Sequence, residues 1–141
     1  MGKFITIKQV HAYPMSAIEA RHKGYQAGDC EDTQEGYEVV YPDGYKSWCP
    51  KEVFDDNSVR ITVDEYSADT ANVADECPDY IKRVVNEHNE LVDKYNKLKC
   101  FIKTDKFIAL SVEEKRRLII QRNIMEAYIS ILEERIESVI D

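Results

Sequence analysis

The feature that most constrains this chain is a regular apolar pattern that begins at Ile81. Apolar or half-apolar residues recur there in alternating steps of three and four positions, namely Ile81, Val84, His88, Leu91, Tyr95, Leu98 and Ile102. Such steps place these side chains on one face of an α-helix and predict a helix that packs lengthwise against a partner. The C-terminal part of the chain is therefore expected to consist of long packed helices.

The pattern is framed by signals for two helices joined by a short turn. Pro78 suits the first turn of a helix, and the apolar pattern predicts that this first helix runs to about Lys103. The connection 104–110 carries three apolar side chains that are expected to cover the end of the hairpin, Phe107, Ile108 and Leu110.

The second helix is predicted over 112–140, because Ser111 and Glu114 form a capping box at its start. Its apolar residues cover well over half of its circumference, which is more than one partner helix can bury. We therefore expect self-association through this helix, with the N-terminal part of the same chain as an alternative cover. The residues expected at an oligomer interface are His88, Leu91, Tyr95, Met125, Tyr128 and Leu132.

The N-terminal part predicts a small α+β module. Alternating β-branched and aromatic residues predict a first strand over Phe4–Tyr13, followed by Pro14. Ser16 is expected to cap a short helix over 17–23, which Gly24 stops.

The clearest local signal is the turn sequence Pro42-Asp43-Gly44. It predicts a tight β-hairpin in which residues 37–41 pair with residues 45–49. A helical turn after this hairpin is expected to place Val53 and Phe54 on the sheet.

These signals predict an α+β fold class, in which a small N-terminal antiparallel β-sheet unit precedes a long antiparallel, coiled-coil-like helical hairpin. The expected domains are a module over 1–63, an acidic linker over 64–77 and the helical hairpin over 78–141. Residues 60–63 are a candidate further strand. The linker assignment rests on five acidic residues and no basic residue within 64–77.

The aromatic residues of the predicted β-hairpin allow two interpretations. Their faces can stack on a base or a cation, which makes Tyr45 and Trp48 candidate ligand-binding residues. Alternating aromatic residues on a hairpin are, however, more commonly the cross-strand core of a small sheet. We favour the core interpretation.

Composition excludes several classes of protein. No apolar run is long enough to span a membrane, and the first residues lack the pattern of a signal peptide, so a cytoplasmic protein is expected. The four cysteines are far apart without a C-x-x-C pair, which favours free thiols. A zinc site from His11, His22, Cys30 and Cys49 can be drawn, but it lacks ligand-pair spacing. We expect neither a metal nor a cofactor.

Positive charge gathers at one end of the predicted helical hairpin. Residues 94–122 contain nine basic and three acidic side chains, although the whole chain has a formal charge of −8. Lysines on an exposed helix face are common, but three consecutive cations at 115–117 oppose the dipole at the start of the second helix. This placement favours an anion-binding site, because arginine forks match phosphate oxygens and free helix amides add donors. The candidate ligand-binding residues are Lys103, Lys106, Lys115, Arg116, Arg117 and Arg122.

No catalytic constellation is visible in the sequence. There is no Ser/His/acid set at usable spacing, no H-E-x-x-H and no glycine-rich phosphate loop, and the three histidines are scattered. We therefore expect a binding protein and not an enzyme.

Two parts of the sequence resemble phage proteins. One resemblance rests on Asp79–Leu91, Cys100–Phe107, Leu110–Lys115, Met125–Tyr128 and Leu132–Ile136. These residues resemble small helical-hairpin proteins of tailed bacteriophages and prophages, a family first named from crAss-like phage. The stretch Gly36–Phe54 is similar to an N-terminal module that phage proteins carry ahead of other domains, one of which looks like the Thoeris anti-defence sponge family. The resemblance implies a phage accessory protein that acts in the cytoplasm of the host cell.

Three hypotheses follow from the sequence. The first is an oligomer of helical hairpins that sequesters a small nucleotide signal through its basic residues. The second is an interaction protein that docks its hairpin on a host or phage protein. The third, binding to DNA or RNA, is disfavoured by the charge of −8 and the acidic linker.

Overall fold

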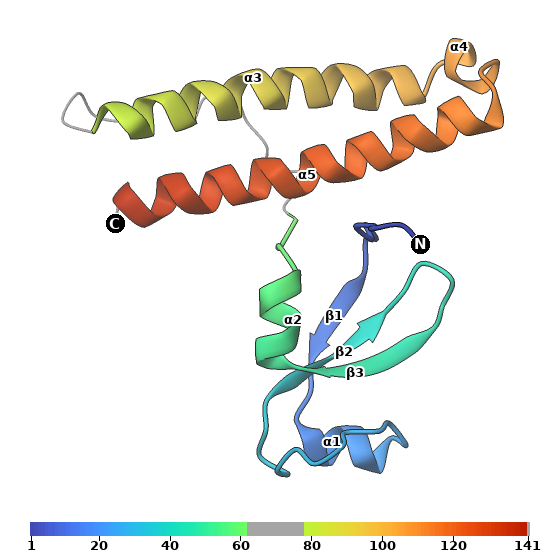
Figure 1. Cartoon of the computed structure of the whole chain (residues 1–141), viewed down its shortest axis with the longest axis vertical. Helices are drawn as coiled ribbons and strands as arrows, with labels where there is room; N and C mark the ends of the chain where they lie inside the picture. The colour runs from blue at the N-terminus through green and yellow to red at the C-terminus, as the bar shows by residue number, and fades with distance from the viewer. Residues whose placement is uncertain (62–77, 141) are drawn as a thin grey trace. The chain divides into compact units, whose positions relative to one another are not determined.

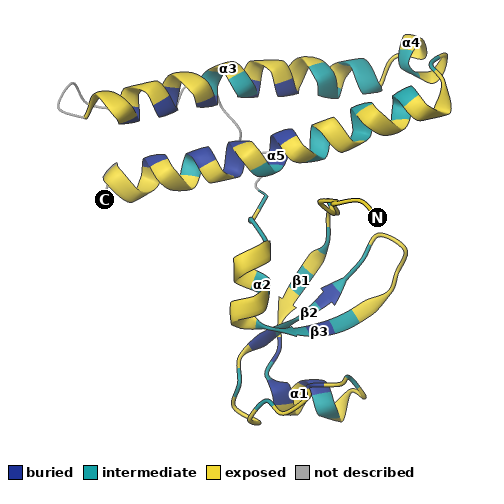
Figure 2. Ribbon diagram, viewed as in Figure 1, coloured by how far each residue is buried: buried dark blue, intermediate teal, exposed yellow. Residues whose placement is uncertain are grey.

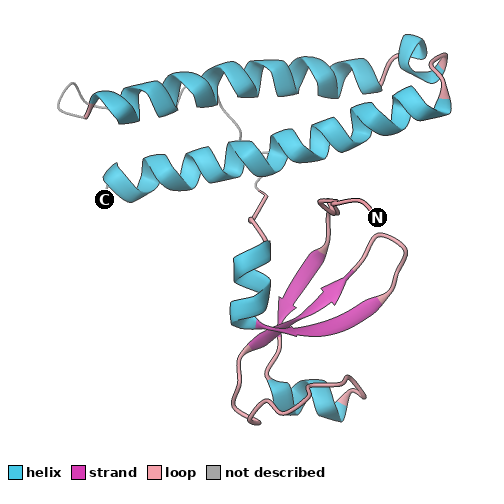
Figure 3. Cartoon of the chain, viewed as in Figure 1, coloured by secondary structure: helices cyan, strands magenta, loops and turns pink. Residues whose placement is uncertain are grey.

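The structure, a computed structural model, describes residues 1–61 and 78–140. These residues belong to two compact units, Met1–Ser58 and Val59–Asp141, called here the N-terminal unit and the helical unit. The first contains a three-stranded antiparallel sheet and the second contains long helices (Figure 3). The α+β fold class is confirmed. The predicted linker, 64–77, lies outside the described residues.

The sheet of the N-terminal unit consists of β1 (His11–Pro14), β2 (Gly36–Val40) and β3 (Lys46–Pro50), in the order β1-β2-β3 (Figure 1). The predicted β-hairpin is confirmed, because Tyr37 pairs with Cys49. Gly44 has a φ of 89°, a left-handed conformation that glycine adopts without steric cost. The carboxylate of the turn also contributes, since Asp43 Oδ1 accepts a hydrogen bond of 3.0 Å from the amide of Tyr45.

The first strand is shorter than predicted. The sequence predicted a strand over Phe4–Tyr13, whereas β1 begins at His11, which pairs with Val40, the last residue of β2. Residues before His11 would have to pair with residues after Val40, but those form the turn. The alternating pattern therefore continues where no partner strand is available.

The core of the N-terminal unit lies around one indole ring. The helix α1 (Ala17–His22) contributes Ala17 and Ala20, and Ser16 caps it as predicted. Trp48 is buried against these alanines, and its Nε1 donates a hydrogen bond of 2.7 Å to the carbonyl of Met15. Space for the ring comes from Gly36, where an added Cβ would lie 2.4 Å from the indole.

The helix that follows the sheet makes one of the two contacts that were predicted for Val53 and Phe54. In α2 (Lys51–Asn57), Phe54 packs its ring 4.8 Å from the ring of Tyr37, as expected for a side chain on the sheet. The prediction for Val53 is wrong, because this side chain is exposed. Successive residues of a helix point about 100° apart, so a single turn cannot place both side chains on the sheet. In the candidate strand 60–63, the described residues 60–61 are not in a strand.

The helical unit is an antiparallel hairpin of α3 (Asp79–Ile102) and α5 (Val112–Ile140), with the short helix α4 (Asp105–Ile108) between them. Figure 1 shows α3 and α5 side by side along their length. Both predicted long helices are confirmed. The face along which α3 and α5 meet is called the seam below.

The seam buries two apolar clusters, one toward each half of the hairpin (Figure 2). The first contains Ile81, Val84, Val85, Leu132 and Ile136, and the second contains Val92, Tyr95, Met125 and Ile129. Four residues of the predicted pattern are fully buried, and Leu91, Leu98 and Ile102 are half-buried. Val85 and Val92 were not predicted, because the contact face is wider than a single line of heptad positions.

The connection between the long helices differs in detail from the prediction. Thr104 caps α4, and the ring of Phe107 packs edge-on at 6.2 Å from the ring of Phe101. Ile108 was expected to cover the end of the hairpin, but it is exposed, because α4 turns it away from this contact. At the start of α5, the amide of Glu114 donates to Ser111 Oγ over 3.1 Å, which gives the first half of the predicted capping box.

Candidate functional site

The six basic residues singled out from the sequence lie at the closed end of the hairpin, called here the tip and comprising residues 94–122. Lys103 follows the last turn of α3, and Lys106 lies in α4. Lys115, Arg116 and Arg117 lie in the first turns of α5 (Figure 1). The fold therefore brings residues from three consecutive elements to one end of the helical unit.

The cations of the tip differ in how far they reach into solvent. Lys103, Lys106 and Arg116 are exposed, whereas Lys115 and Arg122 are half-buried. Lys115 and Arg122 are one heptad apart and share this spacing with Ile129, which is buried in the seam. Their side chains therefore start on the seam face of α5.

Arg122 has a buried donor that the described residues leave unused. Its Nη2 donates a hydrogen bond of 3.2 Å to Oδ1 of Asn123, but its Nε is buried and has no hydrogen-bond partner among the described residues. A buried donor without a partner costs free energy, so an acceptor that reached it would be favoured. Among the six candidate cations, Arg122 is consequently the one whose buried donor most favours binding of an acceptor.

Arg117 already has an anionic partner. Its Nη1 lies 3.1 Å from Oε2 of Glu114, one turn earlier on α5. The second half of the predicted capping box is thus replaced, because the Glu114 carboxylate bonds to Arg117. Exposed ion pairs of this type contribute little and exchange readily with other partners.

The aromatic candidates lie in the N-terminal unit and have different surroundings. Trp48 is a core residue whose indole N–H is already bonded to Met15, so the structure corrects its assignment to ligand stacking. Tyr45 is exposed, with its ring 5.6 Å from the ring of Tyr41. Tyr45 therefore remains the one aromatic candidate with a free face.

Most residues expected at an oligomer interface are covered within the chain. His88, Tyr95, Met125 and Leu132 are buried in the seam, and Leu91 is half-buried there. Since α3 and α5 cover these side chains mutually, they are not available to a second chain in this fold. The correction has a simple cause, because a heptad pattern does not tell whether its partner belongs to the same chain.

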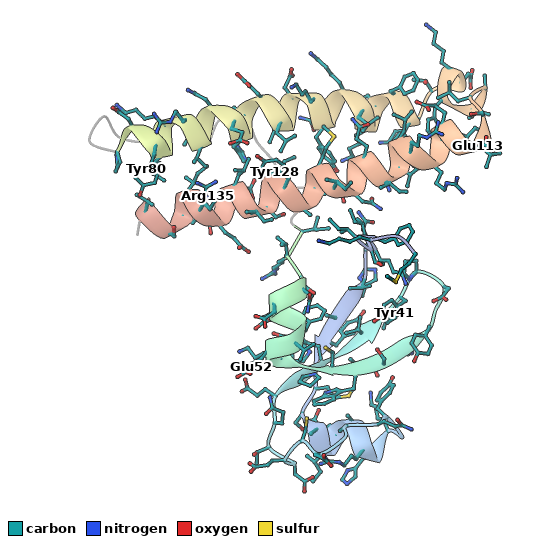
Figure 4. All side chains as sticks on the ribbon, in the orientation of Figure 1. Tyr41, Glu52, Tyr80, Glu113, Tyr128 and Arg135 are labelled. Carbon is teal, nitrogen blue, oxygen red and sulfur yellow. The ribbon has the colours of Figure 1, made fainter. Side chains whose placement is uncertain are left out.

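Tyr128, labelled on α5 in Figure 4, is the exception. Its side chain is partly exposed, and its hydroxyl donates a hydrogen bond to Glu87 Oε1 on α3. This bond, together with partial burial and the charge of Glu87, raises the pKa of Tyr128 above the usual tyrosine value. Tyr128 therefore stays neutral as a hydrogen-bond donor.

Two polar pairs cross the buried seam. His88 Nε2 lies 3.0 Å from Glu133 Oε1, and the hydroxyl of Tyr95 donates to Glu126 Oε1 over 2.6 Å. From the first pair to the second, the residue on α3 moves one heptad forward and the residue on α5 moves one heptad back, so the pairs fix the antiparallel register of α3 and α5. A buried carboxylate is costly unless it is hydrogen-bonded. A shift in register would leave these carboxylates without their donors, so the pairs favour the observed register.

Sequence reasoning missed the acidic members of these pairs. Glu126 is buried and Glu133 is half-buried, at positions that interrupt the apolar pattern of α5. A signal was present, because these two residues are seven apart and so are His88 and Tyr95 on α3. Matching heptad intervals on the two helices are the signal that could have indicated such pairs.

The N-terminal unit has its own polar site. A hollow of about 570 Å³ is lined by Tyr13, Pro14, Met15, Glu19, His22, Lys23 and Glu38. The hydroxyl of Tyr25 donates to Glu38 Oε2 over 2.6 Å, and Lys23 Nζ lies 3.8 Å from the same oxygen. This hollow is open, and its Lys23 already lies beside the Glu38 carboxylate, so it offers less to an anion than the tip does.

The geometry gives no support to the zinc site that can be drawn from His11, His22, Cys30 and Cys49. Within residues 1–61 and 78–140, no group of three or more His, Cys, Asp or Glu side chains is placed to hold a metal ion. Burial raises the pKa of the Cys49 thiol, which disfavours the thiolate that a metal would require. Over the same residues, no helix is long and apolar enough to cross a membrane.

Fold and site together define a class: a small α+β unit joined to an antiparallel helical hairpin with a basic tip. Residues 78–138 match the family model described as Sequestin. The matched segment comprises 61 of the 141 residues and runs from the residue before α3 to within two residues of the end of α5. No curated protein and no solved structure matches the chain. The family description fits a sequestering protein.

Proposed function

We propose that this protein is a non-enzymatic phage accessory protein that binds and withholds a nucleotide-type immune signal in the cytoplasm of the host. The observation that carries the proposal is the position of the Sequestin match, which covers the helical hairpin from α3 to α5. The position of this match supports assigning the sequestering role to the hairpin. The resemblance of Gly36–Phe54 to a module of anti-defence proteins supports the same context.

The chemistry of the tip suits a phosphate-bearing ligand. The tip contains nine basic and three acidic side chains, although the whole chain has a formal charge of −8. The exposed side chains of Lys106 and Arg116 are available to phosphate oxygens, and the guanidinium can bind two of them at once. The first turn of α5 adds backbone amides that have no partner within the helix.

Sequestration requires binding without turnover. The tip offers cations and amides, which hold a phosphate by electrostatic attraction and hydrogen bonds and do not themselves break a bond. A ligand held in this way is removed from its receptor by mass action, so the protein must be present at a concentration comparable to that of the signal.

The proposal is tested by binding and mass measurements on matched charge reversals. Lys106→Glu with Arg116→Glu changes the tip, whereas Lys82→Glu with Arg83→Glu makes the same charge change near the start of α3, about 30 Å away along the helix. Calorimetry with ADP-ribose and cyclic di-AMP as probes should show binding that weakens about tenfold or more in the tip variant and less than about twofold in the control.

Native mass spectrometry identifies the natural ligand. Protein purified gently from cells with an active nucleotide-signalling defence should carry an additional nucleotide-sized mass, which the tip variant should lack. If the protein retains no nucleotide, none of the probes binds, and the tip variant still protects the phage during infection, the proposed function is wrong.

A second candidate function is favoured by apolar side chains on the outer face of α5. Such a face can dock the hairpin on a host or phage protein and block it. This function predicts that the mass spectrum contains a retained protein and no nucleotide, and that outer apolar substitutions abolish protection whereas tip charges do not.

A further inference from the structure

The helix α5 has a second apolar face in addition to the seam. This face, called here the outer stripe, consists of Ile120, Ile124, Tyr128, Ile131 and Val139, whose side chains are each 37–42% exposed. Steps of four, four, three and eight residues keep them on one side of a helix. The outer stripe therefore runs along most of α5 and is not covered by α3.

An apolar stripe of this length is uncommon on a monomer. The contact with α3 buries Ile129, Leu132 and Ile136 and leaves the residues of the stripe partly exposed. Its border with α3 is closed by the hydrogen bond from Tyr128 to Glu87. A further helix packed against α5 would complete the burial of this helix.

The charge of the hairpin identifies which partner fits. The tip contains nine basic and three acidic residues, whereas the opposite, open end contains three basic and nine acidic residues, counted over 78–93 and 123–141. The net charges of the two ends of the hairpin are therefore equal in size and opposite in sign. Only near neighbours interact strongly at physiological salt, where the screening length is about 8 Å.

We propose that the outer stripe binds the outer stripe of a second copy of this chain, with the two hairpins antiparallel. In this arrangement the basic tip of each copy lies beside the acidic open end of the other. A parallel pair would place the two tips side by side, which is unfavourable for charges of the same sign. The proposal concerns the outer stripe and does not depend on the ligand.

The residues that border the stripe support the antiparallel arrangement. Arg117 lies one heptad before Ile124, and Glu134 lies two heptads after Ile120, so both share the face of the stripe. A two-fold axis near the middle of α5 brings Arg117 of each copy beside the second copy's Glu134. Arg117 can leave its exposed partner Glu114 at little cost to make this contact.

The first experiment measures the mass of the full chain by analytical ultracentrifugation. Ile124→Lys with Ile131→Lys should weaken self-association about a hundredfold or more, because two charges would be buried in an apolar contact. The control is Val112→Lys. Val112 is an exposed residue on α5 that lies one heptad before Ile119 and therefore does not belong to the outer stripe. The control variant should associate like the unchanged protein, and helicity measured by circular dichroism should be retained in both.

The second experiment determines orientation with a zero-length reagent that joins amines to carboxylates. In an Arg117→Lys variant, the introduced amine and Glu134 are about 26 Å apart along α5, which is too far for a link within one hairpin. A link between this amine and Glu134 therefore reports two copies in antiparallel contact. Raising the salt from about 50 mM to about 500 mM should weaken the association, whereas a parallel pair would become stronger.

Several outcomes would overturn the proposal. The unchanged protein could remain a monomer while links join its N-terminal unit to α5, in which case the same chain covers the stripe. A dimer without links from tip to open end would exclude the antiparallel arrangement. A dimer that survives the Ile124 and Ile131 substitutions would place the interface elsewhere, whether or not the tip binds a nucleotide.

Discussion

The two units of this protein bury their side chains in different ways. The N-terminal unit gathers three small alanines and Met15 around one large ring, that of Trp48. The helical unit divides its core into two apolar clusters along the seam and inserts polar pairs such as His88 with Glu133 between the helices. The comparison shows that a small sheet can depend on a single side chain, whereas a long hairpin distributes its burial and uses polar contacts to fix register.

The largest expected effect comes from removing the ring at the centre of the N-terminal unit. Trp48→Ala should reduce the stability of that unit by about 3–5 kcal/mol, since it leaves a cavity and an unpaired carbonyl at Met15. Hydrogen exchange measured by mass spectrometry should show protection lost in residues 11–50 and retained in α3 and α5. The control Tyr45→Ala, at an exposed residue just before β3, should cost about 1 kcal/mol or less.

If Trp48→Ala also removed protection from α3 and α5, the comparison between two separately stabilised units would be wrong. A loss in both units would mean that the hairpin depends on the N-terminal unit for its stability.

A smaller effect is expected from a polar pair in the seam. Tyr95→Phe removes the hydroxyl that donates to Glu126 and leaves the ring in place, so the stability of the helical unit should fall by about 1–3 kcal/mol. Thermal denaturation followed by circular dichroism measures this change. Tyr80→Phe, an exposed residue at the start of the same helix, is the matched control and should change stability by about 0.5 kcal/mol or less. If the two substitutions changed the stability equally, the hydrogen bond between Tyr95 and Glu126 would not stabilise the helical unit.

The smallest effect concerns the pH dependence of the N-terminal unit. The hydrogen bond from Tyr25 lowers the pKa of Glu38, burial raises it in part, and the charge of Lys23 lowers it further. Because the folded-state pKa lies below the unfolded one, the carboxylate contributes stability above the unfolded pKa and loses it as pH falls through the folded pKa. Tyr25→Phe should therefore raise the pKa of Glu38 toward its ordinary value and reduce the acid sensitivity of this unit.

Carbon-13 NMR of the Glu38 carboxyl measures the pKa directly. Tyr13→Phe, an exposed tyrosine on β1, provides the control and should leave the pKa of Glu38 unchanged. An unchanged pKa in Tyr25→Phe would show that the hydrogen bond from Tyr25 is not the main cause of the lowered value.

The sequence predicted those parts of the fold that depend on nearby residues. The turn at Pro42-Asp43-Gly44, the cap at Ser16 and both long helices were correct, because backbone preferences and helical periodicity act within a few residues. The basic tip was also visible, since the cations at 103–122 lie on a short connection and on the helix ends beside it. The short strand β1 was overestimated, because its length depends on where β2 ends.

Tertiary structure alone decided which partner each surface meets. The heptad pattern of α3 could serve a second chain or its own hairpin, and the structure assigns His88, Tyr95 and Leu132 to the hairpin. It also places Trp48 in a core and buries Glu126 beside Tyr95, contacts between residues more than thirty positions apart. The physical reason is that periodicity determines which side chains share a face, whereas burial depends on what the folded chain brings against that face.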